Sequence, residues 1–130
     1  NTEILRENLF SERVIRWLHK NLIRVVEEGT AKRGRSEYFT IAGKTGTSQK
    51  FDFKTNRYSR EKVVTYFVGY FPATEPKFVG GIMVDEPSGL AYGGTAAAPY
   101  FKEMVERVSA YYRLNPDKSK ESFPKSGRKK

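Results

Sequence analysis

Residues 39–50 read Phe-Thr-Ile-Ala-Gly-Lys-Thr-Gly-Thr-Ser-Gln-Lys, and this stretch decides how the chain is interpreted. Its alternating apolar side chains are typical of a half-buried β-strand, which leads directly into Lys44, Thr45, Gly46 and Thr47. A glycine here keeps the strand edge free of a side chain, so that another backbone can lie against it. The lysine adds a fixed cation and the threonines add hydroxyls at the same edge.

Gly43, Lys44 and Thr45 also match the ending of a nucleotide-binding P-loop. That motif requires a first glycine five residues before the second, but residue 38 is a tyrosine. It also requires a helix that starts at the lysine and directs its amides at phosphate. Gly46 and a polar stretch without helical periodicity follow instead, so the sequence argues against a P-loop.

Two long helices are expected, one near each end of the chain. Ser11 is a potential N-cap and Gly29 a potential stop, which predicts a helix over residues 11–28. A second helix is predicted over residues 96–113, with Pro99 in its first turn. The first helix has an apolar stripe at helical spacing, which we expect to lie in the core. The stripe consists of Val14, Ile15, Leu18, Leu22 and Val25.

Three strands are expected between these helices. Residues 38–46, 63–70 and 77–84 are rich in β-branched and aromatic side chains. Residues 49–60 are polar and charged, and we expect them to form a loop. Short connections favour antiparallel pairing. The sequence therefore predicts an α+β fold, with an antiparallel sheet of about three strands flanked by two long helices.

The composition limits the possible classes of function. The chain has 130 residues, no cysteine and one histidine, His19. These counts exclude disulfides, thiolate metal sites and multi-histidine metal sites within this sequence, and we expect no cofactor. His19 is expected to be a half-exposed surface residue, and Trp17 a partly buried packing residue. No apolar run is long enough to cross a bilayer.

The net charge of +9 is concentrated toward the C-terminal end. Residues 115–130 contain six basic and two acidic residues, and we interpret them as a basic, disordered tail. Residues 1–114 are expected to form the folded part. The charge and the aromatic strands leave an alternative open, a small basic nucleic-acid-binding domain. A structural or adaptor protein is a further alternative.

The surroundings of Lys44–Thr47 carry a resemblance to a known family. Lys-Thr-Gly at a strand end is one of three signatures of penicillin-binding proteins and serine β-lactamases. Over about residues 1–113, the chain resembles the C-terminal part of the transpeptidase domain of class B penicillin-binding proteins. The other segments that carry the resemblance are, in chain order, residues 25–31, 67–73, 84–87 and 92–101.

The resemblance implies an activity and a location. It implies a serine-type D,D-transpeptidase that crosslinks peptidoglycan stem peptides through an acyl-enzyme, and that β-lactams trap. It implies the extracytoplasmic face of the bacterial inner membrane, with an anchor outside this chain. The expected partners are stem peptides, β-lactams, the rest of the transpeptidase domain and other cell-wall synthesis proteins. Nucleic acid is not expected as a partner on this interpretation.

The resemblance also implies roles for four residues. Lys44 would lie near the nucleophilic serine and attract the substrate carboxylate. Thr45 and Thr47 would bind that carboxylate with their hydroxyls. The Thr47 N–H would form half of the oxyanion hole, so Lys44 and Thr47 are the catalytic candidates. Gly46 would leave room for the substrate strand.

Two motifs of the family have no equivalent in a suitable place. The nucleophile belongs to Ser-x-x-Lys on a packed helix before Lys44, and the second motif is Ser-x-Asn, which this sequence lacks. Ser-x-x-Lys occurs at Ser59, in a polar segment, and at Ser122, in the basic tail. Neither segment has the apolar periodicity of a packed helix. We therefore expect the chain, which begins at Asn1, to be the last third of a catalytic domain and inactive alone.

Overall fold

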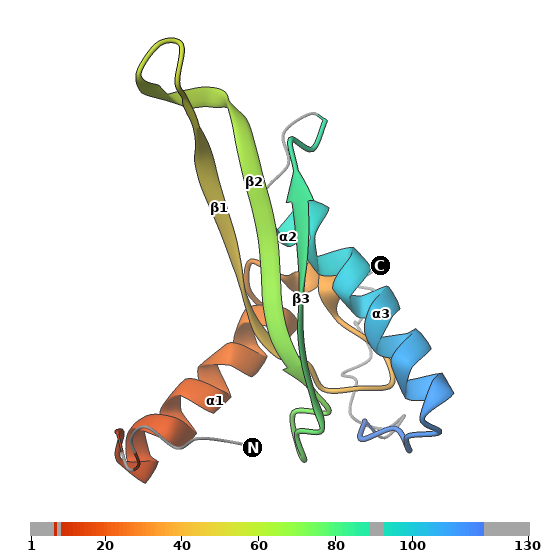
Figure 1. Cartoon of the computed structure of the whole chain (residues 1–130). Coiled ribbons are helices and arrows are strands. Elements are labelled where there is room, and N and C mark those ends of the chain that lie inside the picture. The colour runs from red at the N-terminus through yellow and green to blue at the C-terminus, as the bar shows by residue number, and fades with distance from the viewer. Residues whose placement is uncertain (1–6, 8, 89–92, 119–130) are drawn as a thin grey trace, which may run out of the picture.

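The computed structural model describes residues 7, 9–88 and 93–118, and it confirms the expected α+β fold (Figure 1). Helix α1 precedes a three-stranded antiparallel sheet of order β1-β2-β3, and helices α2 and α3 follow. In chain order the elements are α1 (Glu12–Glu27), the short 3-10 helix η1 (Lys32–Gly34), β1 (Ala42–Asp52), β2 (Arg57–Phe71), β3 (Phe78–Asp85), α2 (Gly93–Ala96) and α3 (Ala98–Tyr111).

The two faces of the sheet differ in what covers them. Residues directly opposite one another in neighbouring strands point to the same face, so the strand register assigns each side chain to one face. We call the two sides the α3 face and the α1 face, after the long helix that each one contacts. The α3 face carries Thr45, Thr47, Phe67, Phe71 and Ile82, and the α1 face carries Lys44, Tyr66, Val68, Tyr70 and Met83.

The hydrophobic core lies between the α3 face and helix α3. The ring centroids of Phe67 and Phe101 are 4.7 Å apart, and those of Phe71 and Phe101 are 6.2 Å apart. All three side chains are buried, together with Ile41 and Val105. Burying a large apolar side chain contributes about 1.5–3 kcal/mol, so these contacts fix the middle of β2 against the helix.

The α1 face is largely open. Val68, Val79 and Met83 are 51%, 79% and 73% exposed, because α1 contacts only one end of the sheet (Figure 1). The prediction that the stripe of α1 is core is wrong for most of its length. Three of its residues are 44–50% exposed, and Trp17, expected to be partly buried, is 66% exposed. The exposed stripe residues are Val14, Ile15 and Leu18.

Residues 49–60 are not the loop that the sequence predicts. β1 and β2 continue as a hairpin through this segment and turn at residues 53–56. Phe51 and Tyr58 face each other across the strands with ring centroids 5.4 Å apart, and Phe51 also contacts Phe53 at 5.1 Å. A ribbon of two strands has no buried face. Its sequence therefore lacks the alternation of apolar and polar residues by which a half-buried strand is recognised.

β1 starts at Ala42 instead of residue 38, because the preceding backbone has other partners. Thr40 N–H donates to Asp117 Oδ1 at 2.7 Å, and Thr40 O accepts from Ala73 N–H at 2.7 Å. Lys118 Nζ contacts Glu27 and donates to Ser36 O. We call Asp117 and Lys118 the C-terminal strap. The remainder of the expected tail, residues 119–130, lies outside the described residues.

The second predicted helix, over residues 96–113, is divided at Ala97 into α2 and α3. Pro99 lies in the first turn of α3, as expected. Proline has no N–H to donate to the carbonyl four residues earlier, so the two helical segments cannot share a continuous hydrogen-bond ladder here. The break places α2 over the strand that carries Lys44.

Candidate active site

β1 places Lys44, Thr45, Gly46 and Thr47 near its beginning, on the outer edge of the sheet. Their partners on β2 are Val68, Phe67, Tyr66 and Thr65. Lys44 is exposed, and its Nζ donates to Thr45 O at 2.8 Å and to Thr45 Oγ1 at 3.3 Å. Among the described residues no strand pairs with the other side of β1. The edge is therefore open to an extended chain.

Thr45 and Thr47 open into a cavity on the α3 face. The cavity has a volume of about 450 Å³ and combines three segments that are distant in the sequence. Thr30 Oγ1 lies 3.0 Å from Thr45 Oγ1, and Gly93 N–H donates to Thr47 Oγ1 at 3.4 Å. The cavity is lined by Thr30, Thr45, Gly46, Thr47, Gly93, Gly94 and Thr95.

Two glycines allow these segments to approach closely. A Cβ on Gly94 would lie 1.8 Å from Thr30 O, which is far inside van der Waals contact. A Cβ on Gly46 would lie 2.1 Å from the ring of Tyr66. The space beside Gly46, which we expected to serve a substrate strand, is thus occupied on the α1 face by Tyr66. Gly46 remains open toward the cavity and along the strand edge.

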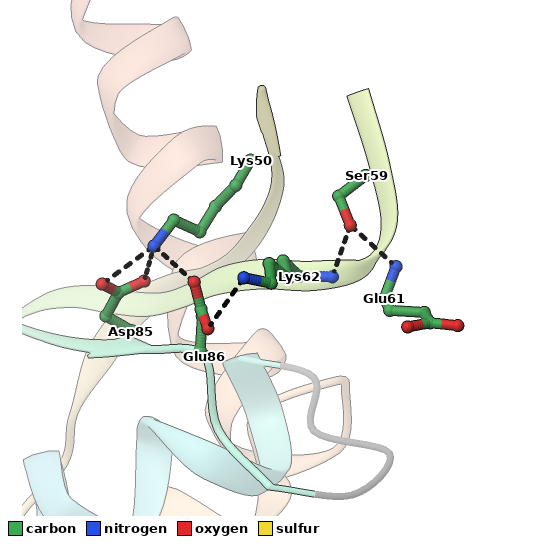
Figure 2. Close-up of polar contacts among 6 residues, drawn as sticks. All are labelled: Lys50, Ser59, Glu61, Lys62, Asp85 and Glu86. Carbon is green, nitrogen blue, oxygen red and sulfur yellow. Dashed lines mark hydrogen bonds and ion pairs between the residues drawn. The ribbon is translucent and has the colours of Figure 1, made fainter. Parts of the chain in front are cut away.

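The Ser-x-x-Lys sequence at Ser59 does not form a nucleophile site (Figure 2). Ser59 lies in β2, and its Oγ accepts from the N–H of Glu61 at 3.2 Å and of Lys62 at 2.8 Å. The Lys62 ammonium instead faces Glu86, at 3.9 Å. A serine and a lysine three residues apart on a strand point to opposite faces, so no lysine is directed at this hydroxyl. Ser122 lies outside the described residues.

A second charged cluster joins the hairpin to the end of β3 (Figure 2). Lys50 Nζ donates to Glu86 Oε1 at 2.7 Å and to Asp85 Oδ1 at 3.0 Å. Hydrogen bonds to two carboxylates raise the pKa of Lys50 above its ordinary value. The bond to Glu86 has the larger effect and the bond to Asp85 the smaller one. Lys50 is therefore engaged by two carboxylates, in contrast to Lys44.

His19 lies away from the threonine cavity. Its Nδ1 is hydrogen-bonded to the Tyr70 hydroxyl at 2.8 Å, between α1 and the α1 face of the sheet. Burial raises the pKa of Tyr70. The side chain of His19 is only partly exposed, and this contact gives it a packing role, in line with the sequence interpretation.

Sequence reasoning missed Thr30 and Thr95 as lining residues. Thr30 follows Gly29 directly after α1, and although residues 25–31 carry part of the family resemblance, no role is assigned to Thr30 from it. Its place beside Thr45 depends on a contact between residues 15 positions apart. Within the described ranges, no three metal-ligating side chains lie together, and no helix has the length and hydropathy needed to cross a membrane.

The chain that forms this cavity can be compared with known proteins. Residues 1–106 match the family described as "Penicillin binding protein transpeptidase domain". This chain belongs to that family. The result confirms the resemblance that the sequence motifs indicated.

One curated relative is the peptidoglycan D,D-transpeptidase FtsI of Buchnera aphidicola, 35% identical over 122 residues. This match covers 88% of the present chain but 20% of the relative. The chain therefore spans about a fifth of the length of this transpeptidase.

Solved transpeptidase structures share the fold. The TP domain of Burkholderia pseudomallei penicillin-binding protein 3 superimposes with a TM-score of 0.75 and 26% identity, covering 92% of this chain and 37% of that one. Penicillin-binding protein 3 of Mycobacterium tuberculosis, solved with ampicillin, gives a TM-score of 0.71 and 26% identity, covering 88% of this chain and 27% of that one. Both structures align with most of this chain.

Proposed function

We propose that this chain is the C-terminal part of a penicillin-binding D,D-transpeptidase and supplies one wall of its active site. The parent enzyme, meaning the longer protein that contains these residues, would crosslink peptidoglycan stem peptides through a serine acyl-enzyme. The observation that carries the proposal is the open edge of β1, where Lys44 and two threonine hydroxyls meet a glycine-lined cavity.

Each residue of this edge has a proposed role. Lys44 supplies a positive charge beside the reacting serine and the substrate carboxylate. Thr45 and Thr47 bind that carboxylate through their hydroxyls, and the Thr47 N–H forms half of the oxyanion hole. Gly46 leaves the strand edge accessible to the substrate backbone. The relative solved with ampicillin supports β-lactams as ligands of the parent enzyme.

The open α1 face supports the idea that a larger domain surrounds this chain. Contiguous exposed apolar surface usually marks an interface. We propose that the remainder of the transpeptidase domain, carrying Ser-x-x-Lys and Ser-x-Asn, packs against α1 and the exposed Val68, Val79 and Met83. An extracytoplasmic location follows from the same proposal, because the stem peptides are found there.

Two of the strand aromatics that suggested a small nucleic-acid-binding domain are engaged within the protein. Tyr66 lies across Gly46, and Tyr70 is hydrogen-bonded to His19. Neither ring is therefore presented for stacking on a base.

Mass spectrometry with a penicillin tests the proposal. The parent enzyme is expected to gain one acyl group on a serine of a Ser-x-x-Lys motif outside this chain. The 130-residue chain alone is expected to gain none, because it lacks that serine. A stoichiometric adduct on Ser59 or Ser122 would overturn the proposal, as would a parent enzyme that forms no adduct.

A further inference from the structure

The hydroxyl of Thr45 lies between the Lys44 ammonium and the hydroxyl of Thr30. Lys44 Nζ lies 3.3 Å from Thr45 Oγ1, and Thr30 Oγ1 lies 3.0 Å from the same atom. A protonated lysine only donates, so Thr45 Oγ1 accepts from Lys44. In the contact between the two threonines either hydroxyl can be the donor.

A carboxylate in the cavity would favour the arrangement in which Thr45 donates to Thr30, because the proton of Thr30 is then available to the carboxylate. Within the described part of the chain, Thr30 Oγ1 has no hydrogen-bond partner besides Thr45. Thr47 is in the same situation, because its Oγ1 accepts from Gly93 N–H. Both threonines are exposed and line the same cavity. The cavity therefore presents two hydroxyl protons, one from Thr30 and one from Thr47.

Thr30 is also held in place by its backbone. Gly94 packs so closely that a Cβ there would lie 1.8 Å from Thr30 O, and the next residue, Ala31, is fully buried. Ala31 N–H donates to Val25 O at 3.0 Å, which ties this segment to the end of α1. A donor fixed in this way needs little reordering when a ligand binds.

We propose that Thr30 is a third hydroxyl of the carboxylate site. Thr30 and Thr47 donate to the two oxygens of the ligand carboxylate, and Thr45, whose proton goes to Thr30, acts on the carboxylate through Thr30 instead of by a hydrogen bond of its own. The inference rests on the proposed function, which brings a carboxylate to this cavity. The Lys44 ammonium polarises the Thr45 hydroxyl, and the Thr45 hydroxyl in turn polarises that of Thr30. Consecutive hydrogen bonds of this kind strengthen one another. Hydrogen bonds to a charged oxygen are the stronger class, so the third hydroxyl contributes measurably to affinity.

The test compares benzylpenicillin, which has the carboxylate, with its neutral methyl ester. In the parent enzyme, Thr30→Val removes the hydroxyl and keeps the shape of the side chain. The second-order rate constant of acylation by benzylpenicillin is expected to fall about tenfold, the usual effect of losing a hydrogen bond to a charged group. The rate constant for the ester, which is already low in the wild type, is expected to stay unchanged.

Three further variants make the result specific. Thr30→Ser restores the hydroxyl and is expected to recover most of the rate with benzylpenicillin. Thr55→Val is the matched control, since it removes a threonine hydroxyl that is bonded to Asp52 at the turn of the hairpin, and it should acylate like the wild type. Thr30→Ala provides a second hydroxyl-free variant if Thr30→Val does not fold.

The possible outcomes separate the inference from the proposed function. An equal loss with both ligands, or no loss with either, would show that Thr30 does not contact the carboxylate, while the transpeptidase assignment would stand. A wild-type parent enzyme that benzylpenicillin does not acylate would overturn the proposed function and this inference together. A selective loss with the carboxylate ligand supports both.

Discussion

The two halves of the β1–β2 hairpin contain similar residues but differ in what surrounds them. In the near half, β1 residues 42–47 pair with β2 residues 65–70, and helix α3 packs below them. In the far half, the hairpin extends beyond the third strand, since β3 pairs with β2 only from Val64 to Phe71 (Figure 1). The near half therefore has a core, and the far half has two exposed faces.

The comparison teaches that residue type alone does not make this site. Each half has a lysine and a hydroxyl close together in the sequence. In the near half, Thr45 meets Thr30 and a cavity formed by other segments. In the far half, Ser59 bonds the backbone of its own strand, and Lys50 is held by carboxylates. In the near half, three segments that are distant in the sequence converge on threonine hydroxyls that line a cavity, whereas the polar groups of the far half are engaged with one another.

The largest expected difference between the halves concerns stability. Phe67→Ala in the near half removes a buried ring from the contact with Phe101, and such truncations cost about 3–5 kcal/mol. Phe53→Ala at the tip of the far half removes a ring that is 89% exposed, and it should change the free energy of unfolding by less than about 0.5 kcal/mol. Urea unfolding of the two variants of the parent enzyme measures both values. Equal losses would mean that the far half is buried in the parent enzyme.

The next difference concerns acylation. Lys44→Ala is expected to lower the second-order rate constant of acylation by a β-lactam about a hundredfold or more, because a preorganised charge is lost from the site. Lys44→Arg should recover only part of the rate, since the guanidinium differs in shape from the compact ammonium. The measurement is stopped-flow acylation of the parent enzyme, with thermal unfolding to confirm that each variant is folded.

Two matched variants serve as controls for Lys44. Lys62→Ala removes a lysine from the far half, and His19→Ala removes a ring that packs on Tyr70. Both should acylate within about twofold of the wild type, as expected for residues outside the site. A folded Lys44→Ala variant that acylates at the parent rate would make Lys44-Thr45-Gly46 a chance match to the motif.

The smallest effect is expected from the ion pairs of the far half. Because Glu86 and Asp85 raise the pKa of Lys50, the pairing stabilises the fold below the unfolded lysine pKa of about 10.5 and is lost as the pH rises through the higher folded value. An NMR titration of the Lys50 side chain should show a midpoint above 10.5 that decreases in the Glu86→Gln variant. An unchanged midpoint in that variant would show that Glu86 is not its main partner.

The sequence predicted the strands where they have a buried face and failed where that condition is absent. The first helix agrees within one residue at each end, and the three strands and their antiparallel order are confirmed. The far half of the hairpin was missed because its side chains face water on both sides. The stripe of α1 was correctly identified as apolar, but periodicity does not specify which partner covers it.

The site was predictable only as far as it is continuous in the sequence. Lys44–Thr47 could be identified from a local motif, and the structure supports their shared position at one edge. The role of Thr30 could not, since its proximity to Thr45 results from a tertiary contact between residues 15 positions apart. This role, like those of the four motif residues, stays a prediction until the variants are measured.

The C-terminal strap has a consequence for how the chain folds during synthesis. Asp117 holds the backbone of Thr40 just before β1, and Lys118 holds the end of α1 through Glu27. A ribosome that adds about 5–20 residues per second needs several seconds to pass from the first of these positions to the last. During that interval the strand with Lys44 can pair with β2 and Ala73 N–H can bond Thr40 O, but Thr40 N–H still lacks its acceptor on Asp117. The backbone that leads into the edge with Lys44 is therefore completed only after residue 117 has been added.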